Sequence, residues 1–161
     1  MQPDPQRLAE RAARLGMLIN IMLPALVAIL AYAAHAAHLM EPVESFTSDP
    51  PILFIALGAV AISELVAAFI IRRVLFSRER AAAVRDDAVK AEQWVLRSSL
   101  IIFVLGASPM IYGAILYLLS GDLRQLAFFG IITLVAYRLF RPTADLIEEA
   151  LQPELSSTGV D

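Results

Sequence analysis

The sequence predicts an all-α integral membrane protein with four transmembrane helices. Of its 161 residues, 58% are hydrophobic and 18% are charged, whereas soluble domains are about 45–50% apolar and about 25% charged. The apolar residues fall into four runs long enough to cross a bilayer. These runs lack the apolar and polar alternation of barrel strands, and in lipid only helices and closed barrels satisfy the backbone.

The first two spans are predicted at Leu15–Ala37 and Ile52–Ile71. The first run has 23 residues without a formal charge, which at about 1.5 Å per residue crosses a hydrocarbon core of about 30 Å. A cleavable signal peptide is the alternative for this run, but its apolar core would be shorter. The second run contains Ser63 and Glu64 and is followed by Arg72 and Arg73.

The third span is predicted at Ser98–Leu119 and the fourth at Leu123–Phe140. Trp94 and Tyr117 lie near opposite ends of the third run, as interfacial aromatic residues do. The segment 120–122, Ser-Gly-Asp, reads as a tight turn between the two spans.

The distribution of positive charge predicts the orientation. Twelve of the thirteen Lys and Arg residues flank the spans on the side of the two termini, and only Arg124 lies on the other side. The positive-inside rule then places both termini and the central connector in the cytoplasm. The predicted organisation is a cytoplasmic segment 1–14, spans 15–37, 52–71, 98–119 and 123–140, an acidic external loop 38–51, a connector 72–97, an external turn 120–122 and a cytoplasmic tail 141–161.

The charged connector is predicted to be helical. From Ser77 to Trp94 it contains no Gly or Pro, and alanines and valines recur at three- and four-residue spacing. The expected architecture is therefore two helical hairpins joined by a helical cytoplasmic connector. The second and third spans are expected to extend into the cytoplasm as helices. A solvated helical hairpin and a docking surface for a partner both fit this pattern.

Glu64 is the strongest candidate for a functional residue. A carboxylate deep in a transmembrane helix costs about 2.5 kcal/mol or more and is a functional hypothesis by default. Glu64, with its neighbour Ser63, is a candidate intramembrane site for an ion, a proton or a hydrogen bond. The alternatives are a neutral carboxyl that hydrogen-bonds between helices, and a carboxylate that reaches water and Arg72 or Arg73.

Small residues predict where helices approach closely. Ala59, Ser63 and Ala67 follow one another at four-residue spacing on one helix face, with Gly58 beside them. Small residues at this spacing allow another helix to pack against the face. Gly106 and Gly113 are the candidate packing positions of the third span.

Metal binding and enzymatic catalysis are not expected. His35 and His38 lie one turn apart and precede two glutamates, but Pro42 interrupts the helix that would align them, and the chain has no cysteine. No nucleophile elbow, phosphate-binding loop or dinucleotide fingerprint occurs in the sequence. We expect no cofactor, and the net charge of −3 excludes a nucleic-acid partner.

The stretch Gly106-Ala-Ser-Pro-Met-Ile-Tyr-Gly-Ala-Ile-Leu116 resembles the second helix of the proteolipid subunit c of rotary ATP synthases. Together with the four spans and the Arg-Pro-Thr sequence at 141–143, it resembles uncharacterised bacterial four-span membrane proteins that share this helix. The match covers about residues 97–143. It places Ala107 where subunit c carries its ion-binding carboxylate, so the resemblance does not transfer that activity.

The sequence therefore predicts a non-catalytic structural or interaction subunit of a membrane assembly or homo-oligomer, and the resemblance implies a bacterial inner (plasma) membrane. Its expected partners are the lipid bilayer and either further copies of itself or other membrane subunits. The alternative is a proton- or cation-translocating proteolipid-like protein or small transporter that uses Glu64.

Overall fold

The computed structural model describes residues 4–37, 39 and 52–152, and all regular structure within them is helical. Four helices are long and apolar enough to cross a membrane, as the sequence predicts. They are a continuous run over Pro5–Ala36, then α3 at Ile52–Leu75, α5 at Ala88–Ser120 and α6 at Leu123–Phe140. Two short helices complete the fold, α4 at Arg78–Ala82 and α7 at Ala144–Leu151.

The first run divides into α1 (Pro5–Met17), a π-helical turn η1 (Leu18–Met22) and α2 (Leu23–Ala36). Pro24 explains the π turn, because a proline lacks the amide hydrogen that would bond the carbonyl of Asn20 four residues earlier. The amide of Leu23 instead bonds the carbonyl of Leu18, five residues earlier. The helix therefore continues through the proline with one wider turn.

Aspartate side chains cap the starts of α5 and α6. Asp87 accepts hydrogen bonds from the amides of Val89 and Lys90 at the start of α5, and Asp122 accepts from the amide of Arg124 at the start of α6. These are N-cap interactions, which satisfy free amides of the first turn. α5 ends at Ser120 and is followed by Gly121, whose φ of 70° is a left-handed conformation that favours glycine.

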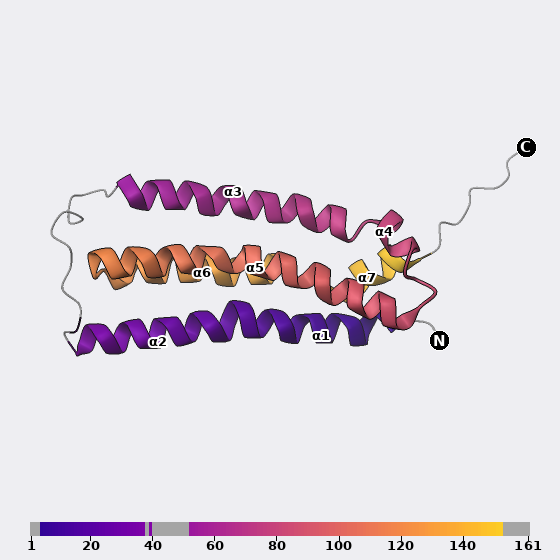
Figure 1. Ribbon diagram of the computed structural model, residues 1–161, viewed down its shortest axis with the longest axis horizontal. Helices are drawn as coiled ribbons and strands as arrows, with labels where there is room; N and C mark the ends of the chain where they lie inside the picture. Colours follow the sequence, from indigo (N-terminus) through magenta and orange to yellow (C-terminus); the bar gives the residue numbers. More distant parts are fainter. Residues whose placement is uncertain (1–3, 38, 40–51, 153–161) are drawn as a thin grey trace, which may run out of the picture.

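α5 lies at the centre of the bundle (Figure 1), where it contacts α1, η1, α2, α3 and α6. α3 lies on one side of the α5–α6 pair and the α1–α2 run lies on the other. The expectation that the first two spans pair as a hairpin is therefore not met: α5 and α6 lie between them.

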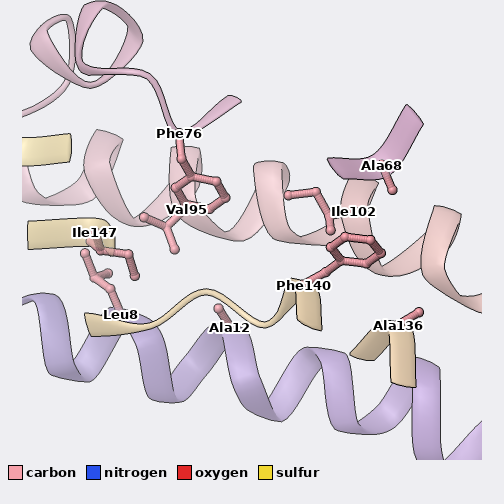
Figure 2. Packing of buried hydrophobic residues seen from close by; sticks show 9 residues of the cluster. All are labelled: Leu8, Ala12, Ala68, Phe76, Val95, Ile102, Ala136, Phe140 and Ile147. Carbon is pink, nitrogen blue, oxygen red and sulfur yellow. The ribbon is translucent and has the colours of Figure 1, made fainter. Parts of the chain in front are cut away.

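Five helices share a core at the arginine-rich end of the bundle, which is the end that carries α4 and α7 (Figure 2). One cluster of buried side chains contains Leu8 and Ala12 of α1, Ala68 of α3, Val95 and Ile102 of α5, Ala136 and Phe140 of α6, Ile147 of α7, and Phe76, which follows α3. Trp94 is packed against this cluster and donates its indole N–H to the carbonyl of Leu75, at 3.2 Å. This bond satisfies a carbonyl that the end of α3 leaves free.

One expectation about the polar segments needs correction. The connector is not one continuous helix, because α4 ends at Ala82 and Asp87 adopts an extended conformation in order to cap α5. The tail 141–161 contains α7, which Thr143 caps and which buries Ile147 and Ala150. The predicted loop 38–51, apart from Leu39, and the end of the tail at 153–161 lie outside the described residues.

Candidate functional site

Glu64 lies at the middle of α3, twelve residues after Ile52 and eleven before Leu75. At about 1.5 Å per residue it is about 17–18 Å from either end of the helix. Its side chain is half-buried and turned toward α5. Among the described residues, no basic side chain lies within 4.0 Å of the Glu64 carboxyl group.

Two hydroxyl groups of α5 hold the carboxyl group. The phenolic oxygen of Tyr112 donates to Oε1 of Glu64 at 2.6 Å. The hydroxyl oxygen of Ser108 is in hydrogen-bond contact with the other carboxyl oxygen, Oε2. Ser108 and Tyr112 are four residues apart, so they lie one above the other on the same face of α5.

Pro109 explains a second contact of Ser108. Because proline has no amide hydrogen, the carbonyl of Leu105, four residues earlier, lacks its usual helical donor. The Ser108 hydroxyl lies 2.7 Å from that carbonyl oxygen and donates to it. The same hydroxyl oxygen therefore contacts both the Leu105 carbonyl and the Glu64 carboxyl group.

The surroundings of the cluster are apolar. Phe129 of α6 is fully buried and meets the ring of Tyr112 edge-on, with ring centroids 6.5 Å apart. Ala61 of α3 and Leu116 of α5 are buried beside it. An apolar neighbourhood strengthens hydrogen bonds and makes an unbalanced charge costly.

The other residues of the predicted site on α3 lie away from this cluster. Ser63 is exposed and donates to the carbonyl of Val60 in its own helix, at 2.7 Å. Ala59 is exposed, Ala67 is half-buried, and a Cβ added at Gly58 would meet nothing within 4 Å. α3 packs on the core through Ala61 and Ala68 instead, so its small-residue face is open in the monomer.

The glycines of α5 lie at helix contacts. A Cβ on Gly113 would be 2.8 Å from Cβ of Phe129, so α5 and α6 touch closely there. Gly106 faces Asn20 of η1 and Ala136 of α6 at larger distances. Ala107 is half-buried and carries no ionisable group.

Two other buried side chains have a polar atom without a hydrogen-bond partner in the described part of the chain. Asn20 and Thr133 are fully buried, and Asn20 donates its amide to the carbonyl of Gly16 at 3.4 Å. Within the described part of the chain, Oδ1 of Asn20 and Oγ1 of Thr133 have no hydrogen-bond partner. Neither group contacts Glu64, so neither belongs to the candidate site.

The predicted weak metal site is not assembled by the described residues. His35 is exposed near the end of α2, and His38 lies outside the described residues. No group of three or more His, Asp or Glu residues that could hold a metal ion occurs in the described ranges.

Sequence reasoning identified Glu64 but did not assign Ser108 and Tyr112 as its partners. Counting residues from the helix ends could have identified both partners. Ser108 lies twelve residues before the end of α5 at Ser120, and Glu64 lies twelve residues after the start of α3 at Ile52. Because these two helix ends are on the same side of the bundle (Figure 1), the two side chains lie at the same depth.

Comparison with protein-family models, with curated proteins and with solved structures finds no match to this chain.

Proposed function

We propose that this chain is a proton-translocating protein of the bacterial inner membrane and that Glu64 is the group that binds and releases the proton. The observation that carries the proposal is that the Ser108 hydroxyl contacts two acceptor groups at once. A hydroxyl group has one hydrogen to donate and two lone pairs that accept. Ser108 contacts two acceptor groups, the Leu105 carbonyl and the Glu64 carboxyl, and it cannot donate to both.

A protonated Glu64 resolves this conflict. Tyr112 then donates to Oε1, the carboxyl hydrogen on Oε2 is donated to Ser108, and Ser108 donates to Leu105. In this series of three hydrogen bonds each hydrogen has one acceptor, and the Leu105 carbonyl that Pro109 leaves free is satisfied. The neutral carboxyl also avoids the cost of a charge in the apolar interior.

The ionised state requires one rearrangement. When Glu64 loses its proton, the Ser108 hydroxyl turns toward the carboxylate, and the Leu105 carbonyl loses its donor. Tyr112 keeps donating to Oε1 in both states. The site therefore has two hydrogen-bond arrangements that differ by one proton and one hydroxyl rotation, with no change of backbone.

The proposed orientation places both termini in the cytoplasm. α1 begins and α7 ends at the end of the bundle that carries α4 (Figure 1), and twelve of the thirteen basic residues belong to that side. The positive-inside rule supports this arrangement. In the proposed topology the connector with α4 is cytoplasmic and the α5–α6 turn at Gly121 is external.

Proton flux into liposomes tests the function. Purified protein is reconstituted with a pH-sensitive dye inside, and a potassium diffusion potential drives protons inward. We expect wild-type protein to acidify the interior and Glu64→Gln to abolish the flux. The glutamine amide of this variant can accept from Tyr112 and donate to Ser108, so the unfolding free energy should change by only about 0.5 kcal/mol or less.

Ser63→Ala is the matched control, because it removes a polar group from the adjacent, exposed position of α3. Its flux should equal that of the wild type. Infrared difference spectra of the same samples should show the band of a protonated carboxyl group, and this band should be missing in Glu64→Gln. Equal flux through wild type and Glu64→Gln would refute the proposal.

Self-association through α3 is the second candidate function, and the open small-residue face favours it. Ala59 and Ser63 are exposed, and nothing lies within 4 Å of a Cβ on Gly58. Small residues let two helix backbones approach in lipid. Ala59→Leu with Ser63→Leu should lower the oligomer mass in native nanodiscs, whereas Ile62→Leu, at an exposed position of the same helix, should not. A monomeric wild type would refute this candidate.

A further inference from the structure

A groove with three arginines opens where the apolar part of α3 ends. It has a volume of about 330 Å³ and lies between the end of α3, the start of α4 and α7. Its charged lining consists of Arg72, Arg73, Arg78 and Glu149, and Phe69 and Leu146 contribute apolar surface.

The positive charge in this groove is only partly balanced. Arg78 pairs with Glu149 at 3.3 Å. Among the described residues, neither Arg72 nor Arg73 has a carboxylate within 4.0 Å. The groove thus carries three guanidinium groups against one carboxylate, an excess of two positive charges.

Arg72 and Arg73 are held by neighbouring groups that leave hydrogen-bond donors free. The Arg72 side chain is half-buried, and its Nη1 donates to the carbonyl of Leu139 on α6 at 3.4 Å. Its buried Nε has no partner within the described part of the chain. The Arg73 guanidinium lies over the ring of Phe69, 4.6 Å from the ring centroid. A guanidinium group has five N–H donors and suits the oxygens of a phosphate.

The position of the groove indicates an amphiphilic ligand. Phe69 belongs to the apolar part of α3 and is exposed to the surroundings of the bundle, whereas the arginines follow it at the polar end of the helix. A phospholipid places its phosphate at this depth and its acyl chains beside the apolar span. Basic pockets at the cytoplasmic ends of transmembrane helices bind anionic head groups in this way.

We propose that this groove binds one anionic phospholipid. Its phosphate lies between Arg72 and Arg73, with Arg78 at the rim, and its acyl chains lie along Phe69. The lipid neutralises the unpaired charge at the end of α3 and, through Arg78, links α3 to α4. This site is independent of Glu64, because it is at the arginine-rich end of α3 and not at the middle.

Native mass spectrometry from nanodiscs of phosphatidylcholine doped with phosphatidylglycerol tests the proposal. The wild type should retain one phosphatidylglycerol molecule in preference to phosphatidylcholine. An arginine that contacts the head group should contribute about fivefold to anionic lipid affinity, so Arg72→Gln with Arg73→Gln should weaken retention by about thirtyfold. Arg7→Gln with Arg85→Gln is the matched control, because it removes the same charge from the same end of the bundle outside the groove, and it should retain the lipid.

Two further measurements keep the test decisive. Arg73→Gln alone changes an exposed side chain and leaves the Arg72–Leu139 bond intact, so it should fold and lose about fivefold in affinity. Excess inorganic phosphate should not displace the lipid, because it has no acyl chain to lie along Phe69. Displacement by phosphate would identify a free-anion site, and equal retention by all variants would identify non-specific annular lipid. Either result would overturn the proposal.

Discussion

Tyr112 donates its phenolic hydrogen to Glu64 across the contact between α5 and α3, with 2.6 Å between the two oxygens. This bond joins the ionisable residue of α3 to the central helix of the bundle. The tyrosine ring packs edge-on against the fully buried Phe129 of α6, which fixes the position of its hydroxyl. Tyr112 of α5 therefore contacts both α3, through Glu64, and α6, through Phe129.

The coupling between Tyr112 and Glu64 is measurable by a double-mutant cycle. Tyr112→Phe removes the hydroxyl and keeps the ring against Phe129. We expect a coupling free energy of about 0.6 kcal/mol, and no more than about 2 kcal/mol, between Tyr112→Phe and Glu64→Leu. Unfolding in mixed micelles can be followed through the fluorescence of Trp94, the single tryptophan. Additive effects of the two substitutions would mean that the bond contributes nothing to stability.

Because Pro109 has no amide hydrogen to donate to the Leu105 carbonyl, the loss of unfolding free energy caused by Ser108→Ala should depend on the residue at position 109. Ser108→Ala leaves the Leu105 carbonyl without a donor, and an unsatisfied buried polar group costs about 1–3 kcal/mol. In a Pro109→Ala background the new amide of residue 109 can bond that carbonyl, so the same substitution should cost clearly less. The unfolding free energies of the four variants provide the comparison. An equal cost in both backgrounds would contradict our assignment of the Ser108 hydrogen to Leu105.

Gly113 should be the least replaceable glycine of the α5–α6 contact. A Cβ at this position would lie 2.8 Å from Cβ of Phe129 and 3.3 Å from Cα of Leu126. Gly113→Ala should therefore force the helices apart and destabilise the bundle by about 1–3 kcal/mol. Gly58→Ala is the control, because its Cβ enters open space; by helix propensity it should be neutral or stabilise by up to about 1 kcal/mol. A neutral Gly113→Ala would show that α6 can move away at little cost.

The sequence was sufficient to predict the number and type of the spans, because length and apolarity alone decide whether a helix can cross a bilayer. The helix over Leu123–Phe140 begins and ends at the expected residues. α3 and α5 run beyond their apolar parts, to Leu75 and from Ala88. Polar residues can continue a helix outside the membrane, so hydropathy does not mark the helix end.

The pairing of the spans could not be predicted from apolar patterns. In lipid every apolar face has a favourable environment, and packing depends on where small residues and hydrogen bonds match. α2 and α3 are adjacent in sequence, yet each packs on the α5–α6 pair. The break in the connector was missed because alanine-rich sequence favours a helix throughout, whereas the N-cap formed by Asp87 starts a new one.

The Asp87 cap predicts that the start of α5 loosens in acid. The backbone amide of Lys90, at 3.2 Å, holds the pKa of Asp87 below its ordinary value. The Lys90 side chain and the amide of Val89 act in the same direction, and burial opposes them. Because the carboxylate is favoured in the folded state, its contribution is complete above the unfolded pKa of about 3.9 and is lost as the pH falls through the lower folded pKa.

Hydrogen exchange of the Val89 and Lys90 amides measures this effect. Protection factors corrected for the intrinsic exchange rate should be constant from about pH 6 to about pH 4 and should fall below that. Asp87→Asn keeps an acceptor oxygen without a titrating charge, so its protection should not change with pH, and Asp87→Ala should lose protection at every pH. Asp86→Asn is the control, since that side chain is 94% exposed and does not cap the helix, and it should follow the wild type. If wild-type protection stays constant down to about pH 2, the Asp87 carboxylate does not hold the first turn of α5.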